Sequence, residues 1–181
     1  METGLFAYVV QKHRATALHY DFRLEIGGVM PSWSVPKGPT LDPGVKRLAM
    51  PTGPHDLEYR KFEGNIQKGN YGAGTVMIWD EGTYTPEVEL GKGSRRAVTD
   101  RQEAEEVAEA GLRDGNLKFT LYGKKLQGSF ALVRMRGLAG GREAWLLIKH
   151  RDGHCQPGYD ANDHDLSAAS NRTLAEIARG A

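Results

Sequence analysis

Residues 11–25 read QKHRATALHYDFRLE, and from Leu18 onward apolar and polar side chains alternate. Successive side chains of a β-strand point to opposite faces, so the alternation predicts a strand over residues 18–29. Its apolar face consists of Leu18, Tyr20, Phe22, Leu24 and Ile26. Its polar face consists of His19, Asp21, Arg23 and Glu25. We expect such a strand in a sheet that covers a core on one side and faces solvent on the other.

The rest of the chain is rich in turn formers, with 23 glycines and 8 prolines among 181 residues. This composition favours short strands over long helices. Further strands are predicted at residues 5–11, 30–35, 75–80, 83–85, 116–122, 128–135 and 143–149, with another possible within 57–67. Glu81-Gly82 is expected to form the hairpin turn after the TVMIWD strand, and GNYGAG at 69–74 a tight turn without the features of a phosphate-binding loop.

Helix signals are few. Residues 100–112 (DRQEAEEVAEAGL) predict one helix with Thr99 or Asp100 as its N-cap, and residues 173–179 predict a short second helix. Residues 36–56 are expected to form a long loop with a short strand at 47–50, and residues 91–99 a flexible connection. The fold class that follows is mainly β, a single-domain β-barrel over residues 1–160 with short peripheral helices. Residues 161–181 are expected to be a polar tail or linker that contains the short helix.

Composition also limits the possible partners and compartment. The chain has 24 Lys and Arg against 23 Asp and Glu, so its net charge is +1 and any polyanion must be met by a local basic cluster. The single cysteine excludes an internal disulfide and suits a reducing compartment. The start of the chain lacks the pattern of a secretory signal, and no apolar run approaches the roughly 20 residues of a membrane span. We expect a cytoplasmic monomer.

The predicted strand at 18–29 presents an imidazole, a carboxylate and a guanidinium on one face, from His19, Asp21 and Arg23. Neighbours on that face lie about 6.5–7 Å apart. The first two groups are metal ligands, and a guanidinium can clamp a phosphate bidentately. His13 can fold back from the preceding strand as a third ligand, which completes a set typical of catalytic metal sites. The plainer alternative is that these residues form an ordinary solvated strand face.

The loop at 36–56 and the residues after it add groups that suit a bound phosphate. Lys37 and Arg47 can neutralise its charge without titrating. His55 is a candidate general acid, nucleophile or hydrogen-bond donor, and Tyr59 could donate to the same phosphate. Each of these residues alone could be an ordinary surface or core residue. Together they favour a metal-dependent phosphoesterase.

Two other functions fit the same residues. Two histidines and one carboxylate on a barrel are also the ligand set of non-haem iron oxygenases. A non-catalytic module that binds nucleic-acid ends could use a metal only to dock phosphate. The close spacing of His13 to His19 and the crowd of basic residues favour phosphate chemistry over oxygen chemistry.

Several motifs resemble one family in order along the chain. QKHRATALHYDFRLE, SWSVPKGP, VKRLAM, HDLEYRKFEG, GNYGAGTVMIWDEGTY, LKFTLYGKKLQGSFALVRM and AWLLIKHRD are similar to motifs of the 3′-phosphoesterase domain of bacterial DNA ligase D and its stand-alone relatives. The resemblance covers about residues 5–153, and SNRTLAEIARG looks like the segment that links this domain to the ligase.

The resemblance implies a β-barrel with a divalent metal, usually Mn²⁺, with Zn²⁺ or Co²⁺ as other possibilities. It implies removal of a terminal 3′ ribonucleotide and then of the 3′-phosphate, leaving a 3′-OH, in DNA repair by end joining. The implied partners are primer–template 3′ ends and the ligase and polymerase domains of that system. By motif position, the metal ligands are His13, His19 and Asp21. The residues implied to contact phosphate or substrate are Arg23, His55 and Tyr59, supported by Gln11, Lys37 and Arg47.

Overall fold

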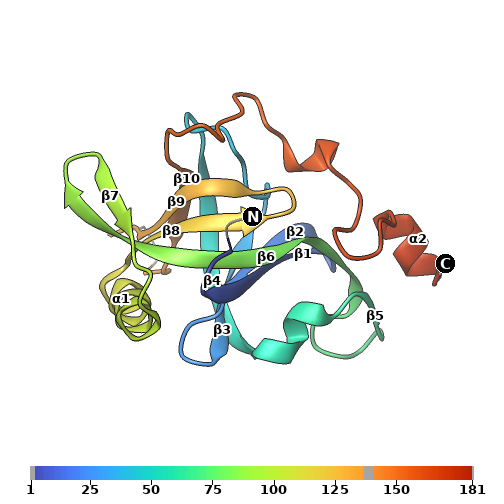
Figure 1. Ribbon diagram of the computed structural model, residues 1–181. Helices are drawn as coiled ribbons and strands as arrows, with labels where there is room; N and C mark the ends of the chain where they lie inside the picture. The colour runs from blue at the N-terminus through green and yellow to red at the C-terminus, as the bar shows by residue number, and fades with distance from the viewer. Residues whose placement is uncertain (1–2, 137–140, 181) are drawn as a thin grey trace.

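The computed structural model describes residues 3–136 and 141–180 (Figure 1). Residues 1–2, 137–140 and 181, which fall in the predicted domain ranges, lie outside the described residues. The strands are β1 Phe6–Arg14, β2 Leu18–Leu24, β3 Val29–Val35, β4 Lys46–Asp56, β5 Gly64–Ile66, β6 Gly74–Gly91, β7 Ser94–Ala97, β8 Asn116–Gly123, β9 Gln127–Arg134 and β10 Trp145–Lys149. The helices are α1 Arg101–Asp114 and α2 Leu174–Arg179, with short 3-10 turns at Leu57–Lys61 and Ala161–Asp163.

Eight antiparallel strands close into a barrel, which confirms the predicted mainly β fold. The strands follow the order β1-β2-β3-β4-β10-β9-β8-β6, and β6 pairs again with β1. β6 can close the barrel because it is long: residues 75–84 pair with β1, and residues 82–86 pair with β8. The short strands β5 and β7 add to the two ends of β6. Closure leaves no free sheet edge along the barrel wall.

The predicted hairpin at Glu81-Gly82 is wrong, because β6 runs through it without a break. Gly82 pairs with Tyr8 on one side and Gly123 on the other. A Cβ at Gly82 would collide with the Tyr122 carbonyl, so the glycine serves the close approach of two backbones. Glu-Gly is common in tight turns, but here it lies at the barrel seam, the part of β6 that pairs with both β1 and β8.

The predicted loop at 36–56 is also shorter than expected, because β4 occupies its second half. β10 pairs with Lys46 to Ala49, and β3 pairs with Met50 to Asp56. Pro51 and Pro54 lie in the part of β4 paired with β3. Proline is tolerated in a strand where one side has no ladder partner, which explains how a Pro-rich sequence still forms a strand.

Two smaller expectations differ from the structure. Residues 57–67 form a 3-10 turn followed by the three-residue strand β5, where one longer strand seemed possible. Residues 91–99 hold β7, which pairs with Glu87–Gly91 of β6 as a hairpin and is therefore more ordered than a flexible connection. The β7 segment SRRA has no apolar alternation, so the sequence did not indicate that it would pair with β6.

The two sides of the sheet have different roles. The barrel interior holds the aromatic core, in which Trp33, Trp79 and Trp145 are at most 2% exposed. The outer side of the sheet carries the polar residues of the first motif. It also carries a small buried cluster of Val9 on β1, Met30 on β3 and Ile78 on β6, against which Leu57 of the 3-10 turn packs. The alternation predicted at 18–29 therefore separates the core from a functional face, although its strand ends at Leu24.

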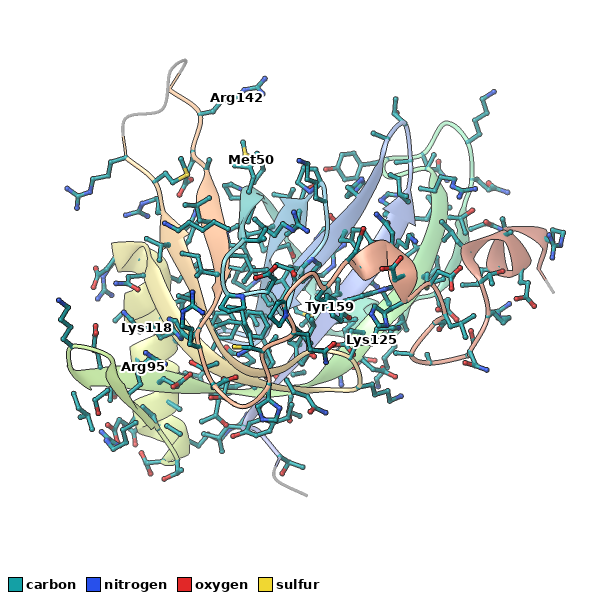
Figure 2. The ribbon with its side chains drawn as sticks, turned by 90° about the horizontal axis from the view of Figure 1, so that it is seen from above. Met50, Arg95, Lys118, Lys125, Arg142 and Tyr159 are labelled. Carbon is teal, nitrogen blue, oxygen red and sulfur yellow. The ribbon has the colours of Figure 1, made fainter. Side chains whose placement is uncertain are left out.

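The helices lie on opposite sides of the barrel (Figures 1 and 2). α1 packs on β6 and β8, and its predicted N-cap is confirmed because the Asp100 side chain accepts from the Glu103 amide at 2.9 Å. α2 packs on β5 and β6 and buries Leu174 and Ile177 in the main core. Neither helix is long and apolar enough to cross a membrane, within the described residues. The division of the chain at residues 160 and 161 stays a prediction.

The buried carboxylate of Asp80 ties β6 to its neighbours. It accepts hydrogen bonds from Tyr8 Oη at 2.6 Å, from the Lys125 amide at 2.8 Å and from the Leu126 amide at 2.9 Å. Gly123 lies against this cluster, and a Cβ there would meet the Tyr8 hydroxyl and would lie 2.5 Å from Asp80 Oδ2. The barrel seam therefore depends on the absence of a side chain at this position.

We expect Gly123→Ala to lower the free energy of unfolding by about 3 kcal/mol, because the added methyl group overpacks the seam and disturbs hydrogen bonds to a buried charge. Urea denaturation followed by tryptophan fluorescence measures the change. Gly153→Ala is the matched control, since nothing lies within 4 Å of a Cβ there; it should change stability by less than about 0.5 kcal/mol. Equal stability of the two variants would contradict the role assigned to the seam.

Candidate metal centre

The polar face of β1 and β2 forms the floor of a cavity of about 420 Å³ on the outer side of the barrel. The antiparallel register sets His13 directly opposite His19 and Gln11 opposite Asp21. Asp21 lies two residues from His19 and thus on the same face. The cavity is lined by His13, Ala15, His19, Asp21, Arg23, Ser34, Thr52, His55, Tyr59, Ile66, Tyr71 and Gly72.

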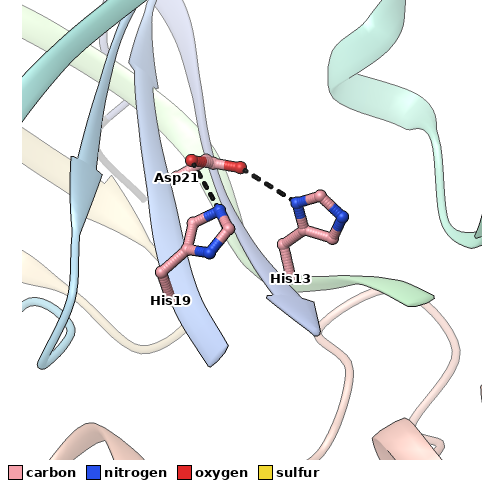
Figure 3. Close-up of side chains that lie close together, drawn as sticks. All are labelled: His13, His19 and Asp21. Atoms are coloured by element: carbon pink, nitrogen blue, oxygen red, sulfur yellow. Dashed lines mark ion pairs between the residues drawn. The ribbon is translucent and has the colours of Figure 1, made fainter. Parts of the chain in front are cut away.

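His13, His19 and Asp21 converge, as Figure 3 shows. The distance from His13 Nδ1 to Asp21 Oδ2 is 3.8 Å, and that from His19 Nε2 to Asp21 Oδ1 is 3.3 Å. One ligand atom from each residue lies within 4.8 Å of the other two, and this is the only such group of three among the described residues. The three predicted ligands are therefore brought together.

The other nitrogen of each imidazole fixes its tautomer. His13 Nε2 lies 2.8 Å from the Gly72 carbonyl, and His19 Nδ1 lies 3.0 Å from the Ala17 carbonyl. A carbonyl oxygen can only accept, so both of these nitrogens carry the proton. In the neutral imidazoles, the nitrogens that face Asp21 then present lone pairs, which can take up a proton or a metal cation. Three acceptors converge on one point, an arrangement that a cation satisfies and that protein-bound metals commonly require.

Electrostatics agree with a site for positive charge. The hydrogen bond to Asp21 raises the pKa of His19, although burial opposes the shift. Burial would raise the pKa of Asp21, but hydrogen bonds from His13 and His19, which can donate to the carboxylate when the imidazoles are protonated, and the Arg23 charge outweigh it and hold that pKa well below its ordinary value. Asp21 is thus ionised at neutral pH, as a metal-binding carboxylate must be.

Arg23 is a buried cation at the edge of this group. Its Nε donates to Gln11 Oε1 at 2.7 Å, and its Nη1 donates to Ser32 Oγ at 3.0 Å and to His55 Nδ1 at 3.1 Å. Its Nη2 donates to Asp21 Oδ2 at 3.3 Å. These contacts use four of the five guanidinium N–H groups. The bidentate phosphate clamp expected from the sequence would therefore require Arg23 to give up one of them.

His55 and Tyr59 lie beside Arg23 in the cavity lining. Burial and the neighbouring Arg23 charge lower the pKa of His55, so this imidazole is neutral at pH 7. His55 Nδ1 lies 3.1 Å from Arg23 Nη1, which can only donate, and 3.2 Å from the Gly53 carbonyl, which can only accept, so it can bond to only one of them at a time. In the tautomer that accepts from Arg23, Nε2 carries the ring proton and is a hydrogen-bond donor. Burial raises the pKa of Tyr59, which keeps its phenol protonated. The Tyr59 ring packs 4.9 Å from the His55 ring and 5.2 Å from the Arg23 guanidinium carbon.

The structure places the remaining predicted residues outside the cavity lining. Gln11 is fully buried; besides accepting from Arg23, it donates to the carbonyls of Tyr59 and Phe62 at 2.9 and 3.1 Å. Gln11 therefore connects Arg23 to the backbone of Tyr59 and Phe62 from behind the cavity lining. Lys37 is exposed after β3, and Arg47 is half-buried on β4 opposite Leu147. Their assignment as substrate-binding residues stays a prediction.

Several lining or supporting residues were missed in the sequence. Ser32 and Ser34 could have been found by extending the period-2 alternation to residues 29–35, which sets them on the outer face with Met30. Thr52 lay inside a segment expected to be a loop. Gly72 and Tyr71 belong to the GNYGAG turn, which is a turn as predicted. No local pattern indicates that its backbone reaches a histidine 59 residues away.

Comparison with known proteins identifies relatives for the whole chain. The family model described as the DNA Ligase D 3′-phosphoesterase domain matches residues 11–134. The multifunctional non-homologous end joining protein LigD of Pseudomonas aeruginosa is 47% identical over 175 residues, which are 95% of this chain and 19% of that protein. The multifunctional non-homologous end joining DNA repair protein LigD of Mycobacterium tuberculosis is 34% identical over 170 residues, which are 94% of this chain and 19% of that protein.

The matched segment contains His13, His19 and Asp21, the candidate metal triad. It also contains Arg23, His55 and Tyr59 and most of the barrel. The chain spans about a fifth of the length of these relatives. The match extends over more than half of the chain and agrees with the resemblance carried by the first motif. The protein belongs to the DNA ligase D 3′-phosphoesterase domain family.

Proposed function

We propose that this protein is a metal-dependent phosphoesterase that processes the 3′ ends of nucleic acid in end-joining repair. It would remove a terminal 3′ ribonucleotide and then the 3′-phosphate, leaving a 3′-OH. The observation that carries the proposal is the convergence of three acceptors, from His13, His19 and Asp21, beside a buried guanidinium and a neutral imidazole donor. A cation and an anionic phosphate could bind side by side in such a cavity.

The donor set fits a divalent transition metal. His13 Nδ1, His19 Nε2 and an Asp21 carboxylate oxygen would hold it, with Mn²⁺ as the proposed ion and Zn²⁺ or Co²⁺ as alternatives. The bound ion would supply Lewis-acid polarisation of a phosphate oxygen. The carbonyls of Gly72 and Ala17 would keep both imidazoles in the ligating tautomer.

The protein's own residues would bind and orient the phosphate. Arg23 would neutralise charge that grows on its oxygens, and the His55 Nε2–H would donate to a non-bridging oxygen. The Tyr59 phenol would be a further donor from the same side of the cavity. In the tautomer that accepts from Arg23, His55 Nε2 would carry a proton, and this supports its role as donor over that of nucleophile.

The wider context follows from the relatives, whose names describe multifunctional end-joining proteins. We propose primer–template 3′ ends as substrates, ligase and polymerase components as partners, and a cytoplasmic location for a monomeric chain. Residues 1–160 would form the phosphoesterase domain and residues 161–181 the tail or linker. Lys37 and Arg47 would contact the nucleic acid beyond the cavity, and Gln11 would hold Arg23 in place.

The direct test is a labelled primer–template that ends in one ribonucleotide or in a 3′-phosphate, incubated with and without Mn²⁺. We expect shortening of the first substrate and loss of phosphate from the second, only with metal. Tight primer binding without any product would favour a non-catalytic end-binding module. Iron-dependent oxygen consumption without phosphate release would favour an oxygenase.

We expect His19→Ala to abolish turnover with Mn²⁺, Zn²⁺ or Co²⁺ and to weaken Mn²⁺ binding at least about tenfold, because one of three ligands is lost. Isothermal titration measures binding, and the primer assay measures turnover. His154→Ala is the matched control, since His154 lies in an exposed loop outside the cavity. Wild-type turnover in the His19 variant would refute the metal assignment.

We expect Arg23→Lys to lower kcat about 100- to 1,000-fold while Mn²⁺ binding changes little. A lysine keeps the charge next to Asp21 but cannot donate to Gln11, Ser32 and His55 together, so the phosphate donors lose their fixed positions. Steady-state kinetics on the 3′-phosphate primer measures kcat. Arg60→Lys makes the same chemical change outside the cavity lining and should leave kcat unchanged. Comparable rates in the two variants would remove Arg23 from the proposed machinery.

A further inference from the structure

Tyr71 is a large aromatic side chain that the structure leaves in solvent. It is 94% exposed, whereas the next most exposed large hydrophobic residue among the described ones, Leu90, is 63% exposed. Tyr71 also lines the cavity that contains the metal triad and Arg23. An aromatic ring buries much apolar area when it finds a partner, so a ring held in water beside a binding cavity is available for contact with a ligand.

The backbone around Tyr71 is fixed, which sets where the ring can reach. The turn is closed by hydrogen bonds from the Asn70 amide to Gln67 and from the Ala73 amide to Asn70, both of 3.1 Å. The next residue, Gly72, accepts from His13 Nε2 at 2.8 Å. The turn ends at Gly74, where φ is +135° and a Cβ would collide with the Arg14 carbonyl. Tyr71 is thus one residue from a group bonded to a proposed metal ligand.

The other aromatic ring in the cavity lining is already occupied. Tyr59 is half-buried and lies between His55 and Phe62, with ring centroids 4.9 and 5.5 Å away. Its third neighbour is the Arg23 guanidinium. The charged groups around it suit a phosphate, whereas Tyr71 offers a ring without charge at the rim. The cavity therefore has one subsite suited to an anion, beside Arg23, and a neighbouring aromatic subsite at Tyr71.

We propose that the nucleobase of the terminal nucleotide stacks on Tyr71 while its phosphate lies at the metal triad and Arg23. This inference rests on the proposed function, because it takes a 3′ nucleotide as the ligand. In a nucleotide the base and the phosphate are joined through one sugar, which matches an aromatic subsite next to an anionic one. Every base has a π-face, so stacking holds the end without selecting its sequence.

The test uses a primer–template with 2-aminopurine as its 3′-terminal base, added without metal so that no turnover occurs. Stacking quenches its fluorescence, and titration gives Kd. We expect Tyr71→Leu to lose the quenching and to weaken binding about tenfold, the effect typical of losing one base–aromatic stack. Tyr71→Phe, which keeps the ring and removes the hydroxyl, should retain both. Leu90→Ala is the control for an exposed apolar residue outside the cavity.

A second substrate with an abasic 3′-terminal nucleotide separates stacking from other roles. On this substrate we expect the wild type and Tyr71→Leu to bind equally. Equal weakening of both substrates in Tyr71→Leu, or wild-type quenching in that variant, would overturn the inference. If the wild-type protein forms no product with Mn²⁺ but its quenching still depends on Tyr71, the proposed function fails and the base contact stands. If product forms with Mn²⁺ but binding does not depend on Tyr71, the base contact fails and the proposed function stands.

Discussion

The site depends on one constraint: both imidazoles of the candidate metal triad donate an N–H group to a backbone carbonyl. His13 donates to Gly72, and His19 donates to Ala17. With those protons fixed, the nitrogens of the neutral imidazoles that meet at Asp21 offer lone pairs. Two lone pairs and a carboxylate within 4.8 Å repel one another unless a cation lies between them. The raised pKa of His19 has the same origin, since a proton is the simplest cation that can relieve this repulsion.

The barrel makes this constraint rigid. His13 and His19 are register partners on adjacent antiparallel strands, and β1 is held on its other side by β6. Side chains that alternate with the triad, such as Tyr20 and Phe22, are fully buried in the core. A slip of one residue in this register would exchange the core and the functional face, so core packing itself fixes the ligands. The Gly72 carbonyl reaches His13 because β5 and the start of β6 bring the glycine-rich turn beside β1.

Local periodicity predicted the parts of the molecule that depend on one strand at a time. The two faces of residues 18–24 and the helix after Asp100 follow from the spacing of side chains along the chain. For the triad, spacing gave His19 and Asp21 on one face with His13 as a candidate third ligand, and the family resemblance assigned all three as ligands. What the sequence could not predict depends on which strands pair with each other. Gly82 looks like a turn residue and is a point of close approach to Tyr122, and residues 94–97 form a strand only because β6 extends far enough to pair with them. The tautomers of His13 and His19 belong to this second class.

Arg23 shows how the two halves of the cavity are coupled. Its contacts with Gln11, Ser32 and His55 span 2.7 to 3.1 Å, whereas its contact with Asp21 is the longest at 3.3 Å. Asp21 is therefore shared between the guanidinium and the converging imidazoles. A cation bound at the triad, as proposed, would compete with Arg23 for this carboxylate charge, and release of the Arg23–Asp21 contact would free an N–H group for an incoming anion. In a chain with a net charge of only +1, such local exchange of partners would allow the proposed phosphate to bind without a general basic surface.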